Sequence, residues 1–170
     1  KNGTLKRHYD QSPQMNFSNL PLPRKDLLPK FSYISKSTIQ ATFGCPYKCD
    51  FCAVISTQKK YLRRPVEDVI KEISEMNGNF VTFVDPSPME DKKYIKRLLR
   101  EMIPLKKMWG GLATVKIGDD EELMDLCAES GCKGLLIGFE SVEQDALVEI
   151  NKGFNVVEKY RNLCARLHER

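Results

Sequence analysis

The sequence contains no apolar run near the roughly 20 residues that a membrane-spanning helix requires. Its first residues also lack the charged, apolar and small-residue segments of a secretory signal peptide. We therefore predict no membrane span and interpret the protein as cytoplasmic. Strong charge is missing too, because the formal net charge is only +4 and Lys and Arg occur in short clusters. This balance does not indicate nucleic-acid binding.

Histidine is scarce, whereas cysteine is not. The chain has only two histidines, His8 and His168, but six cysteines. In a reducing compartment thiols seldom form structural disulfides and more often bind metals or do redox work. The spacing of the cysteines must therefore decide which of these roles each one has. Three of them fall in or near helical segments at spacings unlike a metal motif, and we expect them to pack as small buried residues: Cys127, Cys132 and Cys164.

The pattern of apolar residues predicts an α/β fold with about four parallel strands and flanking helices. Residues 1–36 are proline-rich and show neither the helical nor the strand periodicity of apolar residues. We therefore interpret them as a linker or wrapping arm that precedes a core at 37–170. Strands are expected at 38–43, 80–84, 109–115 and 135–139. Helices are expected at 65–78, 90–102, 119–127, 142–150 and 156–166, the third opening with a capping box of Asp119 and Glu122.

The residues that follow these strands should meet on one rim, because right-handed crossovers bring the carboxyl ends of parallel strands together. A cysteine loop follows the first strand, Asp85 follows the second, Thr114 and Lys116 follow the third, and Glu140 and Ser141 follow the fourth. We therefore predict the functional site on this rim. Arg63 and Arg64, just before the first long helix, are expected on its solvated face.

The cysteine loop carries the strongest chemical signal. Cys45, Cys49 and Cys52 have three and then two residues between them, within the run Gly44-Cys45-Pro46-Tyr47-Lys48-Cys49-Asp50-Phe51-Cys52. Iron-sulfur clusters are normally held by four thiolates, so a tight group of three leaves one iron for a small chelating molecule. The alternative is a zinc site in a protein without enzymatic activity, but structural zinc requires four closed ligands.

This loop, at the end of the first βα strand, resembles the radical S-adenosylmethionine (radical SAM) superfamily. The resemblance implies a partial (βα)6 barrel, here its first four units, and a [4Fe-4S] cluster on Cys45, Cys49 and Cys52. It also implies that S-adenosylmethionine chelates the open iron and is cleaved reductively to a 5'-deoxyadenosyl radical that abstracts hydrogen. Phe51 occupies the aromatic position that lies against the adenine in this family. No general acid or base is assigned.

Two further segments are similar to cofactor-binding parts of the superfamily. Asp85 stands where the family often binds the methionine ammonium. At this position the family commonly has a glycine-rich segment, whereas this chain has Asp85-Pro86-Ser87-Pro88. The alternative role of Asp85 is to cap a helix or to form a turn. Gly138-Phe139-Glu140-Ser141 resembles the stretch that contacts the ribose and methionine portions. Its alternative is that Ser141 caps the next helix, with Glu140 complementing the helix dipole.

The order of these segments resembles the subgroup with a cobalamin-binding domain before the radical domain. Since the chain begins with Lys1, we interpret it as a piece of a longer protein that lacks the C-terminal part of the barrel. The resemblance implies cobalamin in an adjacent domain, a small-molecule substrate, a reductant such as flavodoxin or ferredoxin, and methyl transfer as one outcome. An RNA-modifying enzyme resembling the methylthiotransferases is an alternative, but it would require an additional basic module.

Overall fold

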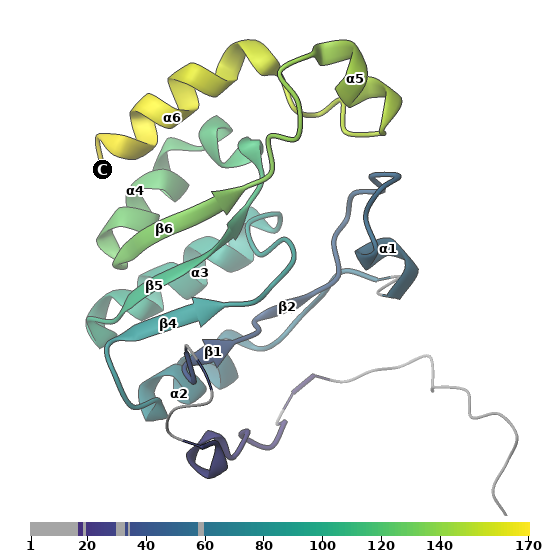
Figure 1. Ribbon diagram of the computed structural model, residues 1–170. Coiled ribbons are helices and arrows are strands. Elements are labelled where there is room, and N and C mark those ends of the chain that lie inside the picture. The colour runs from purple at the N-terminus through teal and green to yellow at the C-terminus, as the bar shows by residue number, and fades with distance from the viewer. Residues whose placement is uncertain (1–16, 19, 30–32, 34, 58–59) are drawn as a thin grey trace, which may run out of the picture.

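A computed structural model describes residues 17–18, 20–29, 33, 35–57 and 60–170. Its centre is a parallel sheet of four strands in the order β1, β4, β5, β6 (Figure 1). The bounds of these strands are Thr38–Ile39 for β1, Phe80–Phe83 for β4, Met108–Ala113 for β5 and Cys132–Ile137 for β6. The register aligns Thr82 with Gly110 and Gly110 with Gly134. The predicted α/β class with four parallel strands is confirmed.

Helices α2 (Val66–Glu75), α3 (Lys92–Met102) and α4 (Glu121–Glu129) cover one face of the sheet (Figure 1). Helix α6 (Tyr160–His168) follows at the β6 end of this layer. Two short helices, α1 (Val54–Thr57) and α5 (Gln144–Glu149), lie instead on the side toward which the strand arrows point. The layers thus leave the carboxyl rim of the sheet to the loops that carry the predicted site.

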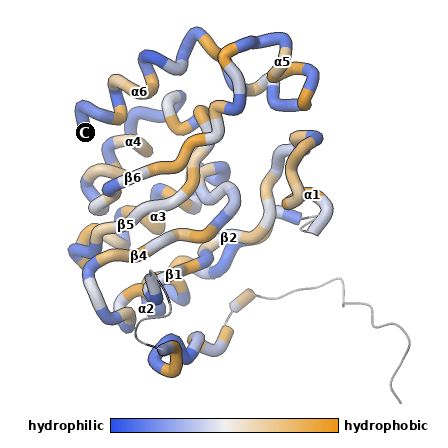
Figure 2. Tube along the Cα trace, in the orientation of Figure 1, coloured by the Kyte–Doolittle hydropathy of each residue, from blue (hydrophilic) through white to orange (hydrophobic). Residues whose placement is uncertain are grey.

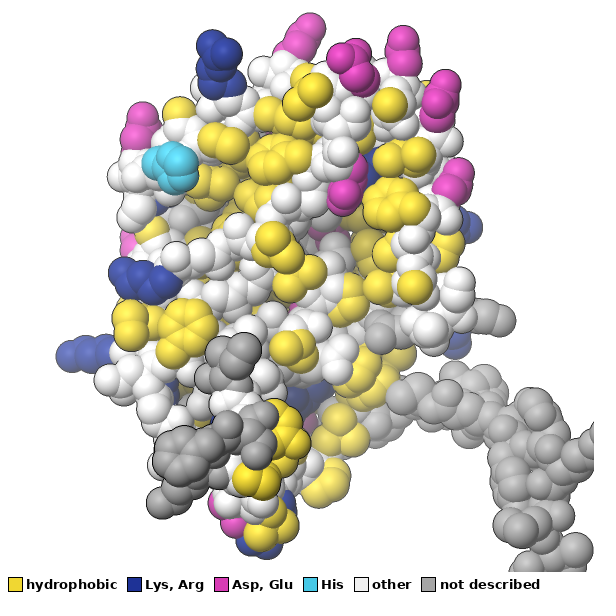
Figure 3. Space-filling model, in the orientation of Figure 1, with side chains coloured by type: hydrophobic (Ala, Val, Ile, Leu, Met, Phe, Trp, Pro, Cys, Tyr) yellow, Lys and Arg dark blue, Asp and Glu magenta, His cyan; other side chains and the backbone are white. Residues whose placement is uncertain are grey.

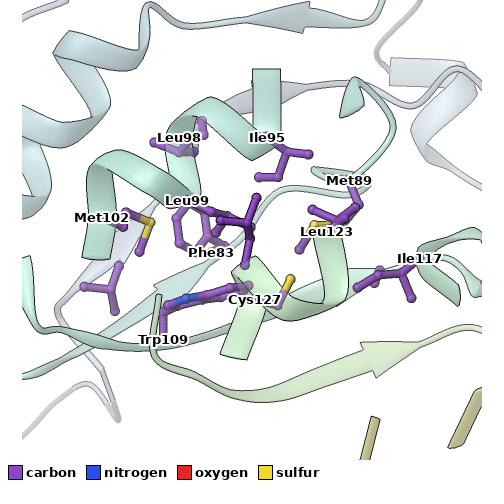
Figure 4. Packing of buried hydrophobic residues seen from close by; sticks show 14 of the residues in the cluster. Phe83, Met89, Ile95, Leu98, Leu99, Met102, Trp109, Ile117, Leu123 and Cys127 are labelled. Atoms are coloured by element: carbon purple, nitrogen blue, oxygen red, sulfur yellow. The ribbon is translucent and has the colours of Figure 1, made fainter. Parts of the chain in front are cut away.

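The hydrophobic core lies between the sheet and these helices (Figure 4). Leu98 and Leu99 of α3 are fully buried, and Phe83 of β4 meets the ring of Trp109 edge to face at a centroid distance of 5.4 Å. Figure 2 shows that hydrophobic residues recur along the strands, while the helices alternate hydrophobic and hydrophilic positions. This alternation is the pattern of helices with one buried stripe, which explains why the helical periods could be read from the sequence.

Trp109 is the sole tryptophan of the chain, and its indole N–H is satisfied inside the core. Nε1 donates to Oγ of Ser130 at 3.0 Å, and Ser130 in turn donates to the Cys127 carbonyl at 3.1 Å. Replacing Ser130 by Ala would leave the indole donor buried without this partner, so we expect a loss of about 1–3 kcal/mol in the free energy of unfolding.

Urea unfolding followed by fluorescence of Trp109 measures the effect of Ser130→Ala directly, because no other tryptophan contributes. Ser74→Ala is the matched control, since the hydroxyl of Ser74 bonds a carbonyl of its own helix at the exposed surface. We expect this control to stay within about 0.5 kcal/mol of the parent. Equal losses in the two variants would contradict a specific role for the buried hydrogen bond.

The strand predicted at 38–43 is wrong as a single element. Only β1 belongs to the parallel sheet, and β2 (Thr42–Phe43) leaves it to pair antiparallel with β3 (Leu62–Arg63). The cause is Asp85, whose Oδ1 accepts hydrogen bonds from the backbone N–H groups of Ala41 and Thr42. Because these two donors are used by a side chain, the sheet ladder ends there and the chain turns toward the cysteine loop.

The N-cap of the third long helix, α4, lies one residue later than predicted. Asp120 is its N-cap and accepts from the N–H of Leu123 at 3.0 Å, so the expected capping role of Asp119 is wrong. Asp119 instead lies in the preceding 3₁₀ turn and pairs with Lys159. At the other end, Gly131 has a positive φ of 91° in the position after the C-cap, where glycine is the favoured residue.

Arg64 corrects another prediction, because it is buried rather than solvated. Its Nη1 lies 2.9 Å from a carboxylate oxygen of Glu72 in α2, and the other oxygen of Glu72 pairs with Lys25 at 2.9 Å. Lys25 belongs to a 3₁₀ turn, Lys25–Leu27, in the segment interpreted as a linker or wrapping arm. This turn therefore packs on α2, whereas residues 1–16 of that segment lie outside the described residues.

The sheet face opposite the helices carries exposed apolar side chains. These residues alternate with the core residues along their strands, and they include Phe80, Val84, Met108 and Leu136. Figure 3, in the same orientation as Figure 1, shows hydrophobic side chains gathered on the face turned to the viewer. None of the described helices is long and apolar enough to cross a membrane.

Candidate functional site

The three predicted cluster ligands lie on the loop between β2 and α1, at the carboxyl rim of the sheet (Figure 1). Cys49 is buried, with 7% of its surface exposed, while Cys45 and Cys52 are half-buried. The loop folds back on itself, because the N–H of Cys52 donates to the Cys49 carbonyl at 3.0 Å. Phe51 projects outward and is 54% exposed.

A distant part of the chain holds this loop. The ring of Tyr47 stacks on Phe154 at a centroid distance of 4.1 Å. The N–H of Asp50 donates to the Ile150 carbonyl at 3.2 Å. The segment that follows α5 therefore packs against the cysteine loop, although about a hundred residues separate the two in the chain. Lys116 lies on the same aromatic pair, with Nζ 4.9 Å from the centroid of Tyr47.

Glu90 connects the cysteine loop to the ends of two strands. Its carboxylate accepts hydrogen bonds from the hydroxyl groups of Tyr47, Ser87 and Thr114. Ser87 follows β4 and Thr114 follows β5, so one side chain ties the loop to both strand ends. Burial and the hydrogen bond to Glu90 raise the pKa of Tyr47, which keeps its hydroxyl a donor. The predicted position of Thr114 and Lys116 on the rim is confirmed by these contacts.

Asp85 follows β4 and is fully buried. Besides the two backbone donors described above, its Oδ1 accepts from the hydroxyl of Thr42 at 2.7 Å. Its Oδ2 is buried and has no hydrogen-bond partner among the described residues. Burial raises the pKa of Asp85 to about 6, against the lowering effect of these hydrogen bonds. One oxygen thus fixes the backbone that leads to the cysteines, and the other is unsatisfied.

Glu140 and Ser141 follow β6 on the same rim. Glu140 has a positive φ of 64°, rare for a residue with a side chain, and its Oε1 accepts from Nζ of Lys152 at 2.6 Å. Ser141 accepts at Oγ from the N–H of Glu143 at 2.9 Å, while Glu143 is the N-cap of α5. Ser141 therefore forms a turn just before the helix. No described contact joins either residue to the cysteine thiols directly.

The electrostatics of the loop combine burial with a nearby cation. Burial raises the pKa of the Cys49 thiol, and the thiols of Cys45 and Cys52 raise it further. The ammonium of Lys152 acts in the opposite direction and favours the thiolate. The three thiols thus lie close enough to influence one another. Within the described residues, no group of three or more Cys, His, Asp or Glu side chains has the arrangement that holds a single metal ion.

The chain matches the model of the Radical SAM superfamily over residues 39–170, and it belongs to this superfamily of enzymes. Bacteriochlorophyllide d C-12(1)-methyltransferase of Chlorobaculum tepidum is 30% identical over 138 residues, which cover 77% of this chain and 30% of that protein. Hopanoid C-2 methylase of Rhodopseudomonas palustris is 27% identical over 157 residues, which cover 85% of this chain and 29% of that protein.

A solved structure gives the same fold. The radical S-adenosylmethionine methyltransferase TsrM from Kitasatospora setae superposes with a TM-score of 0.69 over 79% of this chain and 28% of that chain, at 20% sequence identity. That structure holds a tryptophan substrate and an analogue of S-adenosylmethionine. The chain described here spans less than a third of the length of these three proteins.

Sequence reasoning predicted that the cysteine loop lies on the rim but missed the residues that hold this loop in place. Tyr47 lies inside the motif, and Glu90 begins the predicted second helix, yet neither was assigned a role. Lys152 and Phe154 were missed because their proximity to the loop depends on tertiary packing. The available signal was that both residues follow the helix after the fourth strand, where the chain must return past the rim.

Proposed function

We propose that Cys45, Cys49 and Cys52 hold a [4Fe-4S] cluster whose fourth iron binds S-adenosylmethionine. The observation that carries this proposal is a three-thiol loop at the carboxyl rim of a parallel sheet, in a chain that belongs to the Radical SAM superfamily. A cluster bound there would supply the electron that cleaves the sulfonium of S-adenosylmethionine to a 5'-deoxyadenosyl radical. The chain's own residues would hold the cluster, orient the cofactor and exclude water.

The chemistry of the loop fits an anionic iron-sulfur group. Three thiols provide the soft ligands that such clusters require. Lys152 places a positive charge near them and favours the thiolate form of Cys49. Tyr47 and Phe154 shield one side of the loop with a stacked aromatic pair. A buried thiolate would otherwise be costly, so the cation supports a charged group at this position, while the aromatic pair limits the access of water.

Two carboxylates support a cationic ligand on the same rim. The unsatisfied Oδ2 of Asp85 is a buried acceptor, and an ammonium is the kind of donor that would relieve it. Glu140 retains a second oxygen beyond its bond to Lys152, and we propose that it accepts from the ribose hydroxyls or the ammonium. Phe51, exposed beside the third cysteine, is proposed to lie against the adenine, and Ser141 to contact the same cofactor.

Methyl transfer to a small organic molecule is the reaction that the relatives favour, since those named above are methyltransferases of a bacteriochlorophyllide and a hopanoid. We propose that cobalamin is bound outside residues 37–170 and that residues 1–36 connect the two regions. A cytoplasmic protein such as flavodoxin or ferredoxin is proposed as the reductant. Methylthiolation of RNA remains the alternative reaction.

The test uses the full-length protein, reconstituted anaerobically with iron and sulfide and incubated with S-adenosylmethionine, dithionite and hydroxocobalamin. We expect 5'-deoxyadenosine as a product, and S-adenosylhomocysteine as well if cobalamin is methylated. Chromatography separates the two products. Formation of neither by protein with a full complement of iron and sulfide would contradict the proposed reaction, while 5'-deoxyadenosine formed only with RNA present would favour the alternative.

A further inference from the structure

Lys152 is a buried cation to which the proposed reaction assigns no chemical step. Its side chain is 9% exposed, and Nζ donates to Oε1 of Glu140 at 2.6 Å. A lysine is almost never buried to this degree unless it is paired, and its full charge is retained only if the surroundings compensate for the lost hydration. Glu140, on the rim after β6, compensates in part for the lost hydration of the Lys152 ammonium by pairing with it. The side chain of Glu140 is itself 36% exposed.

Several hydrogen bonds fix the position of Lys152. Its N–H donates to the Leu147 carbonyl at 2.7 Å, and its carbonyl accepts from the N–H of Asn155 at 3.0 Å. The side chain of the buried Asn155 donates to the carbonyls of Gly138 and Phe139, at 3.0 and 3.1 Å. The turn that carries the lysine is therefore attached to the end of β6 rather than lying free on the surface.

The space for the ion pair comes from Gly138. A Cβ at this position would lie 2.4 Å from Oε1 of Glu140 and 2.9 Å from Nζ of Lys152. A larger residue would thus displace the pair from the rim. Gly138 belongs to the Gly-Phe-Glu-Ser run, which the sequence indicated only as a cofactor-binding stretch. Because it has no side chain, it also lets Lys152 approach Glu140.

The buried ammonium faces the cysteine loop. Nζ lies 5.7 Å from the ring centroid of Phe51, the residue before Cys52, and 6.0 Å from that of Phe154. The backbone bond between Asp50 and Ile150 joins the two segments directly. Lys116 is a second cation in this region, but it lies on the rings of Tyr47 and Phe154. The ammonium of Lys152 lowers the pKa of the Cys49 thiol, against the larger effect of burial.

We propose that Lys152 is a positioning residue that sets the electrostatic environment of the cysteine loop and raises the reduction potential of the cluster bound there. This inference rests on the proposed cluster. Adding one electron makes the cluster and its three thiolates more negative by one charge. A fixed cation beside the loop stabilises the reduced form more than the oxidised form. Glu140 offsets part of this effect, so the pair together tunes the potential.

The test is a redox titration with dithionite of the anaerobically reconstituted protein, without S-adenosylmethionine, followed by the electron paramagnetic resonance signal of the reduced cluster. Lys152→Met removes the charge and keeps the length of the side chain. We expect the ratio of reduced to oxidised cluster at a fixed potential to fall about threefold to tenfold. A tenfold change corresponds to a midpoint about 59 mV lower for one electron.

Three further variants separate charge from packing. Lys152→Arg keeps the charge and is expected to keep the parent potential. Glu140→Gln removes the compensating anion and is expected to move the potential upward, opposite to Lys152→Met. Lys116→Met removes the other cation of the aromatic pair and is expected to move it less. Iron and sulfide contents are measured on every sample, so that an altered signal is not mistaken for lost cluster.

The outcomes are distinguishable. An unchanged potential in Lys152→Met with normal iron and sulfide overturns this inference and leaves the proposed function standing. Equal shifts in Lys152→Met and Lys116→Met also overturn it, because the effect would then be one of general charge. A parent protein that takes up no iron and sulfide overturns both. If Lys152→Met loses its cluster, the opposite shift in Glu140→Gln still decides the question.

Discussion

Replacing Cys49 by Ala is expected to abolish cluster binding. The variant, reconstituted anaerobically beside the parent, should remain colourless in the visible range and retain little iron and sulfide, because two thiolates are too few to hold a four-iron cluster. Cys49 is the buried member of the trio and the one on which Lys152 acts, so its loss removes the ligand that the structure places most firmly. Visible absorption after desalting measures the effect.

The matched control for Cys49→Ala is Cys164→Ala. Cys164 is half-buried in α6 and is far from the loop in sequence, so its variant should bind iron and sulfide as the parent does. Fluorescence of Trp109 in urea shows whether either variant is still folded. A folded Cys49→Ala protein with the colour and iron content of the parent would refute the assignment of the loop as a cluster site.

Replacing Asp85 by Ala is expected to destabilise the chain by about 2–5 kcal/mol, because two buried backbone donors would lose their acceptor. These donors are the N–H groups of Ala41 and Thr42, at the point where the chain leaves the sheet for the cysteine loop. The loss should appear as a lower midpoint in urea unfolding, and the cysteine loop should be the first region to lose protection from hydrogen exchange.

Replacing Asp85 by Asn is expected to have the opposite effect on stability at neutral pH. The asparagine oxygen can accept the same hydrogen bonds, and the charge is gone. In the parent the pKa of Asp85 is raised to about 6, from an ordinary value of 3.8. The unfolded chain therefore loses this proton first as pH rises. Stability from the protonated carboxyl is complete below about pH 4 and is lost progressively up to about pH 6, by about 3 kcal/mol in all.

Unfolding measured from pH 4 to pH 7 tests this linkage. Asp85→Asn should lack the decline between pH 4 and pH 6 and should be no less stable than the parent at pH 7. The same variant separates two roles of the residue, because it should bind S-adenosylmethionine more weakly if Oδ2 accepts from the ammonium. Asp85→Asn as unstable as Asp85→Ala at pH 7 would mean that the charge itself holds the backbone.

The elements that were predicted well are those whose apolar pattern is contained within the element itself. Helix α3 buries Ile95, Leu98, Leu99 and Met102 along one stripe, and strand β4 is a short apolar run, so local sequence sufficed for both. The strand at 38–43 was misread because a side chain from position 85 ends its ladder, and no local pattern reports that contact. Arg64 was misread for the same reason, since Glu72 and Lys25 together compensate its burial.

The site also contains features that could be predicted from local sequence and features that could not. Cysteine spacing lies within nine consecutive residues, and the rim follows from the rule that parallel strands end together, so both could be inferred from sequence. The ion pair of Glu140 and Lys152 and the stack of Tyr47 on Phe154 join segments that only the folded chain brings together. Whether Asp85, Glu140, Ser141 and Phe51 bind the cofactor stays a prediction.

The central claim is that three thiols of one loop hold an iron-sulfur cluster with one iron left for S-adenosylmethionine. Metal and acid-labile sulfide analysis of protein reconstituted and desalted under argon tests it most directly. The account predicts iron and sulfide in equal amounts, about four of each per chain. Protein that instead retains zinc and contains no sulfide would contradict it.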